Sequence, residues 1–159
     1  MFHTSSGGGG RATALAPVLR AATRPGATDV LLISPHSIDK ATLERAISHA
    51  RWNVIQVHTC EEALAVMASV LVPVVICDRD SANGHWKEAM KTIFASQHPA
   101  PVLLATDEYD WRLWVDTIDN GGFELITRPF HGVEQTLLAA KRHWKKGRVR
   151  RNWDHFFGR

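Results

Sequence analysis

The chain has 159 residues, of which 45% are hydrophobic, so it is long enough for one domain with a real core. Its two cysteines, Cys60 and Cys77, are too few for a disulfide framework or a four-cysteine zinc site, and they favour a reducing, cytoplasmic location. The net charge of +3 hides an asymmetry, because residues 1–140 carry 11 Lys/Arg and 15 Asp/Glu whereas residues 141–159 carry 8 Lys/Arg and only Asp154. Any attraction to polyanions therefore belongs to the tail and not to the domain.

Neither a membrane span nor a phosphate-binding glycine loop is expected. The longest nearly apolar stretch, residues 63–77, is shorter than the roughly 20 residues that a membrane-spanning helix needs, and Pro73 interrupts it. Residues 1–28 combine the run Gly7–Gly10 with serines and prolines, a composition that predicts a flexible N-terminal arm. The glycines lack a preceding strand and a following Lys-Ser/Thr pair, so we interpret them as linker.

From Asp29 onwards, short apolar runs alternate with amphipathic stretches in five repeats of strand then helix. The expected strands are Val30–Ile33, Val54–Val57, Val72–Cys77, Pro101–Ala105 and Phe123–Thr127. The expected apolar helix stripes are Leu43, Ala46, Ile47 and Ala50; Ala63, Leu64 and Met67; Trp86, Met90, Ile93 and Phe94; Trp111, Trp114, Val115 and Ile118; and Val133, Leu137, Ala140 and Trp144. This alternation predicts an α/β domain over residues 29–146, with helices on both faces of a parallel sheet. Residues 147–159 form a basic C-terminal tail without a clean period, which we expect to be loosely docked or disordered.

Polar side chains gather where the expected strands end. The first strand is followed by Ser34-Pro35-His36, the third by Asp78-Arg79-Asp80, the fourth by Thr106 and the fifth by Arg128-Pro129-Phe130. Open α/β sheets bind ligands at the carboxyl ends of their strands. We therefore expect these four groups to meet at one edge of the sheet.

On these residues, the stretch from about residue 29 to residue 146 resembles a response-regulator receiver domain of two-component signalling. Asp78, at the end of VVICD, corresponds to the phosphorylated aspartate of that family, and Thr106 in PVLLAT corresponds to its switch residue. The segment GGFELITRPF is similar to the family's G-A-x-x-y-l-x-K-P-F, which implies a cis peptide bond before Pro129. The resemblance implies the five-stranded (βα)5 flavodoxin-like fold with strand order 2-1-3-4-5.

The chain departs from the family pattern at its metal-binding pocket. Receivers ordinarily hold Mg²⁺ with two adjacent acidic residues after the first strand, and here Ser34 and Pro35 stand in those positions. Asp78, with a backbone carbonyl near Asp80, is expected to bind Mg²⁺ only weakly, and the imidazole of His36 is a poor substitute for a hard oxygen ligand. The expected lysine after the fifth strand is Arg128, which keeps the positive charge in a planar fork.

A second resemblance concerns the subfamily. The CDRD motif followed by Trp86, the Gly121-Gly122 pair and the His143-Trp144 pair are similar to stand-alone, atypical bacterial receivers that lack the acidic pair. This resemblance implies a receiver that a histidine kinase or phosphotransfer protein phosphorylates on Asp78, and whose state alters the binding of a downstream protein. The alternative is a pseudo-receiver, an interaction module that works without phosphorylation. Enzymatic activity is not expected, because only fold analogy favours a bound nucleotide.

Each candidate residue also has a structural interpretation. Asp78 can cap the turn that follows its strand, Thr106 can cap the next helix, and Arg128 can form an ion pair with Asp78 or Asp80. The tryptophan-rich stripes are interpreted as core, because they recur at helical spacing. Metal binding by histidine and cysteine is not expected, since no two of them have a recognised ligand spacing. Nucleic-acid binding by the basic, aromatic tail is not expected either, although such tails can stack on bases.

Overall fold

The computed structural model describes residues 25–157, and residues 1–24 of the predicted N-terminal arm lie outside the described part. Its elements are β1 (Thr28–Ile33), α2 (Asp39–Ala46), β2 (Trp52–Val57), α3 (Cys60–Ser69), β3 (Val74–Asp78), the short 3₁₀ helix η1 (Ser81–Gly84), α4 (Trp86–Phe94), β4 (Val102–Thr106), α5 (Trp111–Asp119), β5 (Glu124–Thr127) and α6 (Val133–Phe157). The strands form one parallel sheet with the order β2-β1-β3-β4-β5. The predicted α/β class, the five parallel strands and their order are confirmed.

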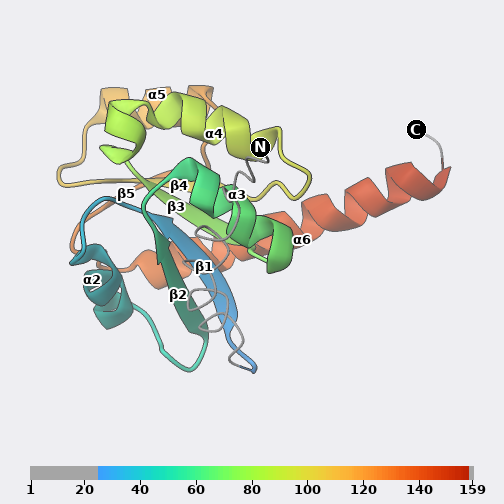
Figure 1. The fold of residues 1–159 in the computed structure, drawn as a ribbon, viewed down its shortest axis with the longest axis horizontal. Helices are drawn as coiled ribbons and strands as arrows, with labels where there is room; N and C mark the ends of the chain where they lie inside the picture. The colour runs from blue at the N-terminus through green and yellow to red at the C-terminus, as the bar shows by residue number, and fades with distance from the viewer. Residues whose placement is uncertain (1–24, 158–159) are drawn as a thin grey trace, which may run out of the picture.

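Helices cover both faces of the sheet, as Figure 1 shows. Leu31 and Ile33 of β1 point to the face covered by α3, α4 and α5, whereas Val30 and Leu32 point to the face covered by α2 and α6. All five residues of β3 are buried, which is what a central parallel strand with helices on both sides requires. The polar residue Asp78 is therefore held at the end of a fully buried strand.

The predicted core stripe on α5 is wrong. Trp111, Trp114, Val115 and Ile118 are exposed, and the residues of α5 that face the core are Leu113 and Thr117. Gly122 allows the turn to approach Thr117 closely, because a Cβ on Gly122 would lie 2.6 Å from Thr117 Cγ2. Helical spacing correctly predicted that these four residues share one side of α5, but it could not say whether the sheet or solvent covers that side.

The segment beyond Gly147 also differs from the prediction. We expected a loosely docked or disordered tail from this residue onwards, but α6 continues without a break to Phe157. Figure 1 shows its C-terminal half extending beyond the sheet. A helix tolerates one glycine at a cost of about 1 kcal/mol, and cationic side chains near its C-terminus interact favourably with the helix dipole.

Within residues 25–157, no helix has the length and apolar character needed to cross a membrane. Cys77 is buried and Cys60 half-buried, and both are free thiols. Burial raises the pKa of the Cys77 thiol to about 12, so this cysteine stays protonated.

Candidate functional site

The four polar groups at the strand ends meet at one edge of the sheet, as predicted. β3 ends at Asp78, which is paired in register with Ala105, and β4 ends at Thr106, which is paired with Thr127 just before Arg128. An open pocket of about 820 Å³ lies at this edge and is lined by Asp78, Thr106, Arg128 and the loop that leads into α5.

Asp78 is buried, and both of its carboxylate oxygens are engaged. Its side chain is 1% exposed. Oδ2 accepts a hydrogen bond of 2.9 Å from the backbone N–H of Asp80, so Asp78 does cap the turn that follows its strand. Oδ1 accepts a hydrogen bond from the guanidinium of Arg128. The site therefore holds the carboxylate in one orientation.

Arg128 joins several carboxylates. Its Nε donates to Asp39 Oδ1 at 2.8 Å and its Nη2 to Asp39 Oδ2 at 2.7 Å, which is the bidentate geometry for which a guanidinium is suited. Nη2 also contacts Asp78, and Nη1 reaches the exposed Asp107 at 3.3 Å. The ion pair predicted between Arg128 and Asp78 is present, and within residues 25–157 the ion pairs of Arg128 do not include Asp80. The hydrogen bond with Asp39, opposed by burial, raises the pKa of Arg128 further above its usual value.

Asp39 is the site residue that the sequence did not reveal. It is the first residue of α2, is 1% exposed, and accepts a hydrogen bond of 2.6 Å from Ser34 Oγ in addition to the two from Arg128. Burial alone would raise the pKa of its carboxyl, but the hydrogen bonds from Arg128 and Ser34 outweigh burial and lower the pKa. An aspartate in the first turn of a helix is ordinary, so its position in the sequence carried no signal of this role.

The two positions where receivers carry acids have different surroundings. Ser34 is fully buried, and its hydroxyl oxygen accepts from the backbone N–H of His36 at 3.0 Å while donating to Asp39. Pro35 is exposed. The negative charge that these positions lack is thus supplied by Asp39, which comes five residues after Ser34 and reaches the same pocket from the start of α2.

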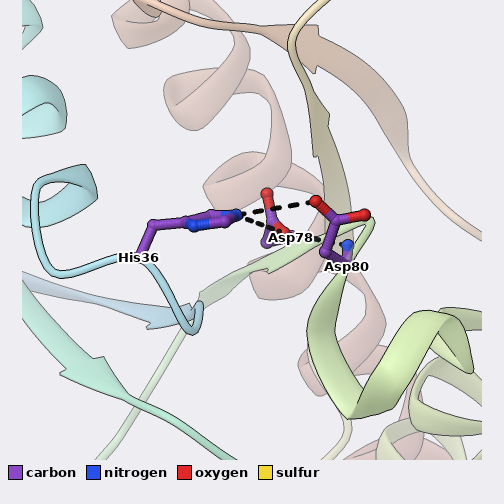
Figure 2. A group of neighbouring side chains, drawn as sticks. All are labelled: His36, Asp78 and Asp80. Carbon is purple, nitrogen blue, oxygen red and sulfur yellow. Dashed lines mark hydrogen bonds and ion pairs between the residues drawn. The ribbon is translucent and has the colours of Figure 1, made fainter.

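His36 lies beside the acidic turn, as Figure 2 shows. Its Nε2 is 3.5 Å from Asp78 Oδ2 and 3.6 Å from Asp80 Oδ2. The spacing rules for histidine and cysteine ligands did not identify this group, because its other members are aspartates from a different strand end.

Thr106 and Pro129 occupy the positions that the resemblance implied. Thr106 is the last residue of β4, is buried, and lines the pocket beside Asp78. The interpretation of Thr106 as a helix cap is wrong, because α5 begins at Trp111 and its cap is Asp110, whose side chain accepts from the backbone N–H of Arg112 at 2.9 Å. The peptide bond between Arg128 and Pro129 is cis, as expected.

The described side chains do not fit the Mg²⁺ that receivers hold. This ion requires near-octahedral oxygen coordination, usually from one or two carboxylates and several waters. Both oxygens of Asp39 accept hydrogen bonds from Arg128, which also occupies Oδ1 of Asp78. The remaining oxygen of Asp78, Oδ2, lies beside an imidazole nitrogen of His36, and Mg²⁺ does not favour nitrogen ligands. The guanidinium of Arg128 thus occupies the carboxylate oxygens of Asp39 and Asp78 that a metal cation would need as ligands.

Comparisons with known proteins identify the fold. No family model and no curated protein matches the chain. Among solved structures, the signal receiver domain of an HD domain-containing protein from Pseudomonas fluorescens Pf-5 matches with a TM-score of 0.67 and 20% identity, covering 81% of this chain and 97% of that one. The chemotaxis response regulator CheY4 of Vibrio cholerae matches with a TM-score of 0.55 and 20% identity over 74% of this chain and 98% of that one. A response regulator from Thermotoga maritima matches with a TM-score of 0.61 and 17% identity over 73% and 96% of the two chains.

These matches cover nearly the whole of each solved receiver, and they reach the same conclusion as the strand order and the strand-end residues. At about one identical residue in five, a structural likeness establishes the fold and leaves the activity to be argued from the site. The chain has the fold of response-regulator receiver domains.

Proposed function

We propose that this protein is a signal receiver of the two-component type, which accepts a phosphoryl group on Asp78 and thereby changes its binding of a partner protein. The observation that carries the proposal is the position of Asp78: a carboxylate at the end of the central strand, bordering an open pocket that Thr106 and Arg128 also line. The phosphoryl donor in this proposal is a histidine kinase or a phosphotransfer protein in the cytoplasm. The protein itself acts through contacts and not as an enzyme on a separate substrate.

The chemistry requires a carboxylate in line with the phosphorus and positive charge close to the transferred group. An oxygen of Asp78 forms the new P–O bond, while the bond from phosphorus to the donor's nitrogen or oxygen breaks and the donor leaves with its electron pair. Arg128 already contacts Asp78, and its planar fork suits phosphoryl oxygens as well as carboxylates. This guanidinium supplies the positive charge that receivers otherwise obtain in part from a metal ion.

The switch follows from the neighbours of Arg128. An aspartyl phosphate carries more negative charge than a carboxylate, so it draws the guanidinium away from Asp39 and Asp107 and attracts a hydroxyl such as that of Thr106. Asp107 begins the loop that leads into α5, and Trp111 of that helix lines the same pocket. The expected consequence is a shift of this loop and of the exposed α5 face, which is the surface proposed to bind the partner.

The test is incubation of the purified protein with a small acyl phosphate, with and without Mg²⁺, read by intact-protein mass spectrometry. The proposal predicts one phosphoryl adduct on the wild type and none on the Asp78→Asn variant. Because the described side chains do not fit Mg²⁺, we expect the yield to depend little on this ion. An adduct that persists in Asp78→Asn would place the modification elsewhere and refute the assignment.

A second candidate, the phosphorylation-independent pseudo-receiver, is favoured by the bridge that Arg128 makes between Asp39 and Asp78. In that case the guanidinium permanently neutralises the site, and partner binding does not depend on phosphate. It predicts no adduct on the wild type under any condition, and Arg128→Lys, which introduces the residue that receivers carry at this position, tests whether the bridge is the cause. An adduct on Arg128→Lys but not on the wild type would show that the bridge alone blocks the reaction.

A further inference from the structure

A histidine and two aspartates converge on one point beside the Arg128 bridge, with which they share Asp78 (Figure 2). His36 follows β1, Asp78 ends β3, and Asp80 belongs to the turn after it. One ligand atom from each side chain, His36 Nε2 and an oxygen of each carboxylate, lies within 4.8 Å of the other two. Three potential metal ligands are thus assembled from two strand ends that are far apart in the sequence.

The spacing of these atoms matches a small divalent cation. Zn–N and Zn–O bonds of about 2.0 Å at a tetrahedral angle place neighbouring ligand atoms about 3.3 Å apart. His36 Nε2 lies 3.5 Å from Asp78 Oδ2 and 3.6 Å from Asp80 Oδ2. Both distances from His36 Nε2 are close to this spacing, and all three ligand atoms lie within 4.8 Å of one another.

Hydrogen bonds orient the carboxylate of Asp78 and fix the backbone that carries His36 before any ion arrives. Asp78 Oδ2 accepts the N–H of Asp80 at 2.9 Å and keeps a second lone pair for a cation. The loop that carries His36 is tied at both backbone atoms: its N–H donates to Ser34 Oγ at 3.0 Å, and its carbonyl accepts from Gln56 Nε2 at 2.8 Å. Such outer contacts orient ligands and raise metal affinity.

The electrostatics also leave room for an ion. Arg128 contacts Oδ1 of Asp78, whereas the three-ligand group uses the other oxygen. The side chains of His36 and Asp80 are 43% and 71% exposed, so an ion can enter from solvent and waters can complete its coordination. The two carboxylates contribute a charge of −2, of which Arg128 offsets one unit at Asp78, so the group still attracts a cation.

We propose that His36, Asp78 and Asp80 form a binding site for a divalent transition-metal ion of the zinc class, and that this site discriminates against Mg²⁺. Imidazole nitrogen is a good ligand for zinc and the late first-row metals, whereas Mg²⁺ takes oxygen ligands almost exclusively. The ion binds to unphosphorylated protein, so the proposal goes beyond the signalling function and does not depend on it.

The experiment measures binding of Zn²⁺ to the unphosphorylated full chain by equilibrium dialysis with metal analysis, in the presence of millimolar Mg²⁺. Cobalt(II) is a second probe, because its visible absorption reports nitrogen and oxygen coordination directly. The test variants are His36→Gln and Asp80→Asn, which remove exposed ligands and leave the buried Asp78 intact. His85→Gln is the matched control, since His85 is exposed and lies 3.7 Å from a single carboxylate, that of Glu88.

The proposal predicts one Zn²⁺ that His36→Gln and Asp80→Asn each lose. A lost ligand should weaken binding by more than the about 10–100-fold that a lost outer-shell contact costs. His85→Gln should bind as the wild type does. Equal affinity in wild type and His36→Gln would overturn the proposal, and so would displacement of Zn²⁺ by Mg²⁺ at comparable concentrations. Neither result bears on phosphorylation of Asp78, which the mass-spectrometric assay tests separately.

Discussion

The bridge made by Arg128 predicts a large loss of stability when its guanidinium is removed. Arg128→Ala leaves the carboxylates of Asp39 and Asp78, each 1% exposed, without a cation. Removing one partner of a buried ion pair typically costs about 3–5 kcal/mol, because the remaining charge is buried and uncompensated. The total stability of a domain is only about 5–15 kcal/mol, so we expect a marginally folded protein.

Two further substitutions divide this effect into charge and geometry. Arg128→Lys keeps the charge but loses the fork that binds both oxygens of Asp39, and it should cost about 1.5–3 kcal/mol, the contribution of one hydrogen bond to a charged group. Asp107→Asn removes a partner that is 83% exposed, and it should change stability by less than about 1 kcal/mol.

The assay is urea unfolding at neutral pH, followed by tryptophan fluorescence. The unfolding free energies of the three variants are compared with that of the wild type, provided that their m-values are the same. Trp52, which is 2% exposed, is suited to report loss of the core. If Arg128→Ala costs no more than Asp107→Asn, the bridge contributes nothing measurable and the argument for a built-in cation fails.

Three other perturbations test the same site and its support. The pKa of Asp39 is lowered in the folded state, so its ionised form stabilises the fold above about pH 4, and this contribution is lost as pH falls through the folded pKa. The stability of wild type should therefore fall more steeply below about pH 4 than that of Asp39→Asn, as acid titration of unfolding would show. Ser34→Asp places a second carboxylate where Ser34 Oγ lies 2.6 Å from Asp39, and like-charge repulsion should lower the melting temperature; an unchanged melting temperature would contradict the close contact between position 34 and Asp39. Gly122→Ala places a Cβ 2.6 Å from a Thr117 methyl, which should cost about 1–3 kcal/mol in chemical denaturation; a neutral result would mean that the turn can move away from α5.

Local patterns in the sequence were sufficient to predict the strands and their order in the chain. Apolar runs such as Val72–Cys77, which ends in Asp78-Arg79-Asp80, are typical of strands buried on both faces, and the structure has strands at all five expected places. The orientation of α5 was not predictable in the same way. Its tryptophans recur at helical spacing, yet the sheet contacts the opposite side of the helix at Leu113 and Thr117. Periodicity predicts that apolar residues share one face of a helix, whereas tertiary packing decides whether protein or solvent covers that face.

The site was predictable where strands end and unpredictable where a helix begins. Parallel strands place their carboxyl ends at one edge, so Asp78, Thr106 and Arg128 were expected together. Asp39 comes from the first turn of α2, and its contact with Arg128 spans 89 residues of sequence. No local pattern encodes such a contact, because it depends on how far the loop after β1 carries the helix across the sheet edge.

The loss of the acidic pair and the gain of Arg128 are best understood as one change. The carboxylates of Asp39, Asp78 and Asp80 lie at this edge beside the exposed Asp107, and they repel one another unless a cation separates them. Asp39 and Asp78 are buried and share one guanidinium, which leaves Asp78 Oδ2 and the carboxylate of Asp80, both beside His36, to face a further cation. The ligands that remain there include nitrogen, and this difference in ligand type, more than any loss of charge, separates this pocket from one built for Mg²⁺.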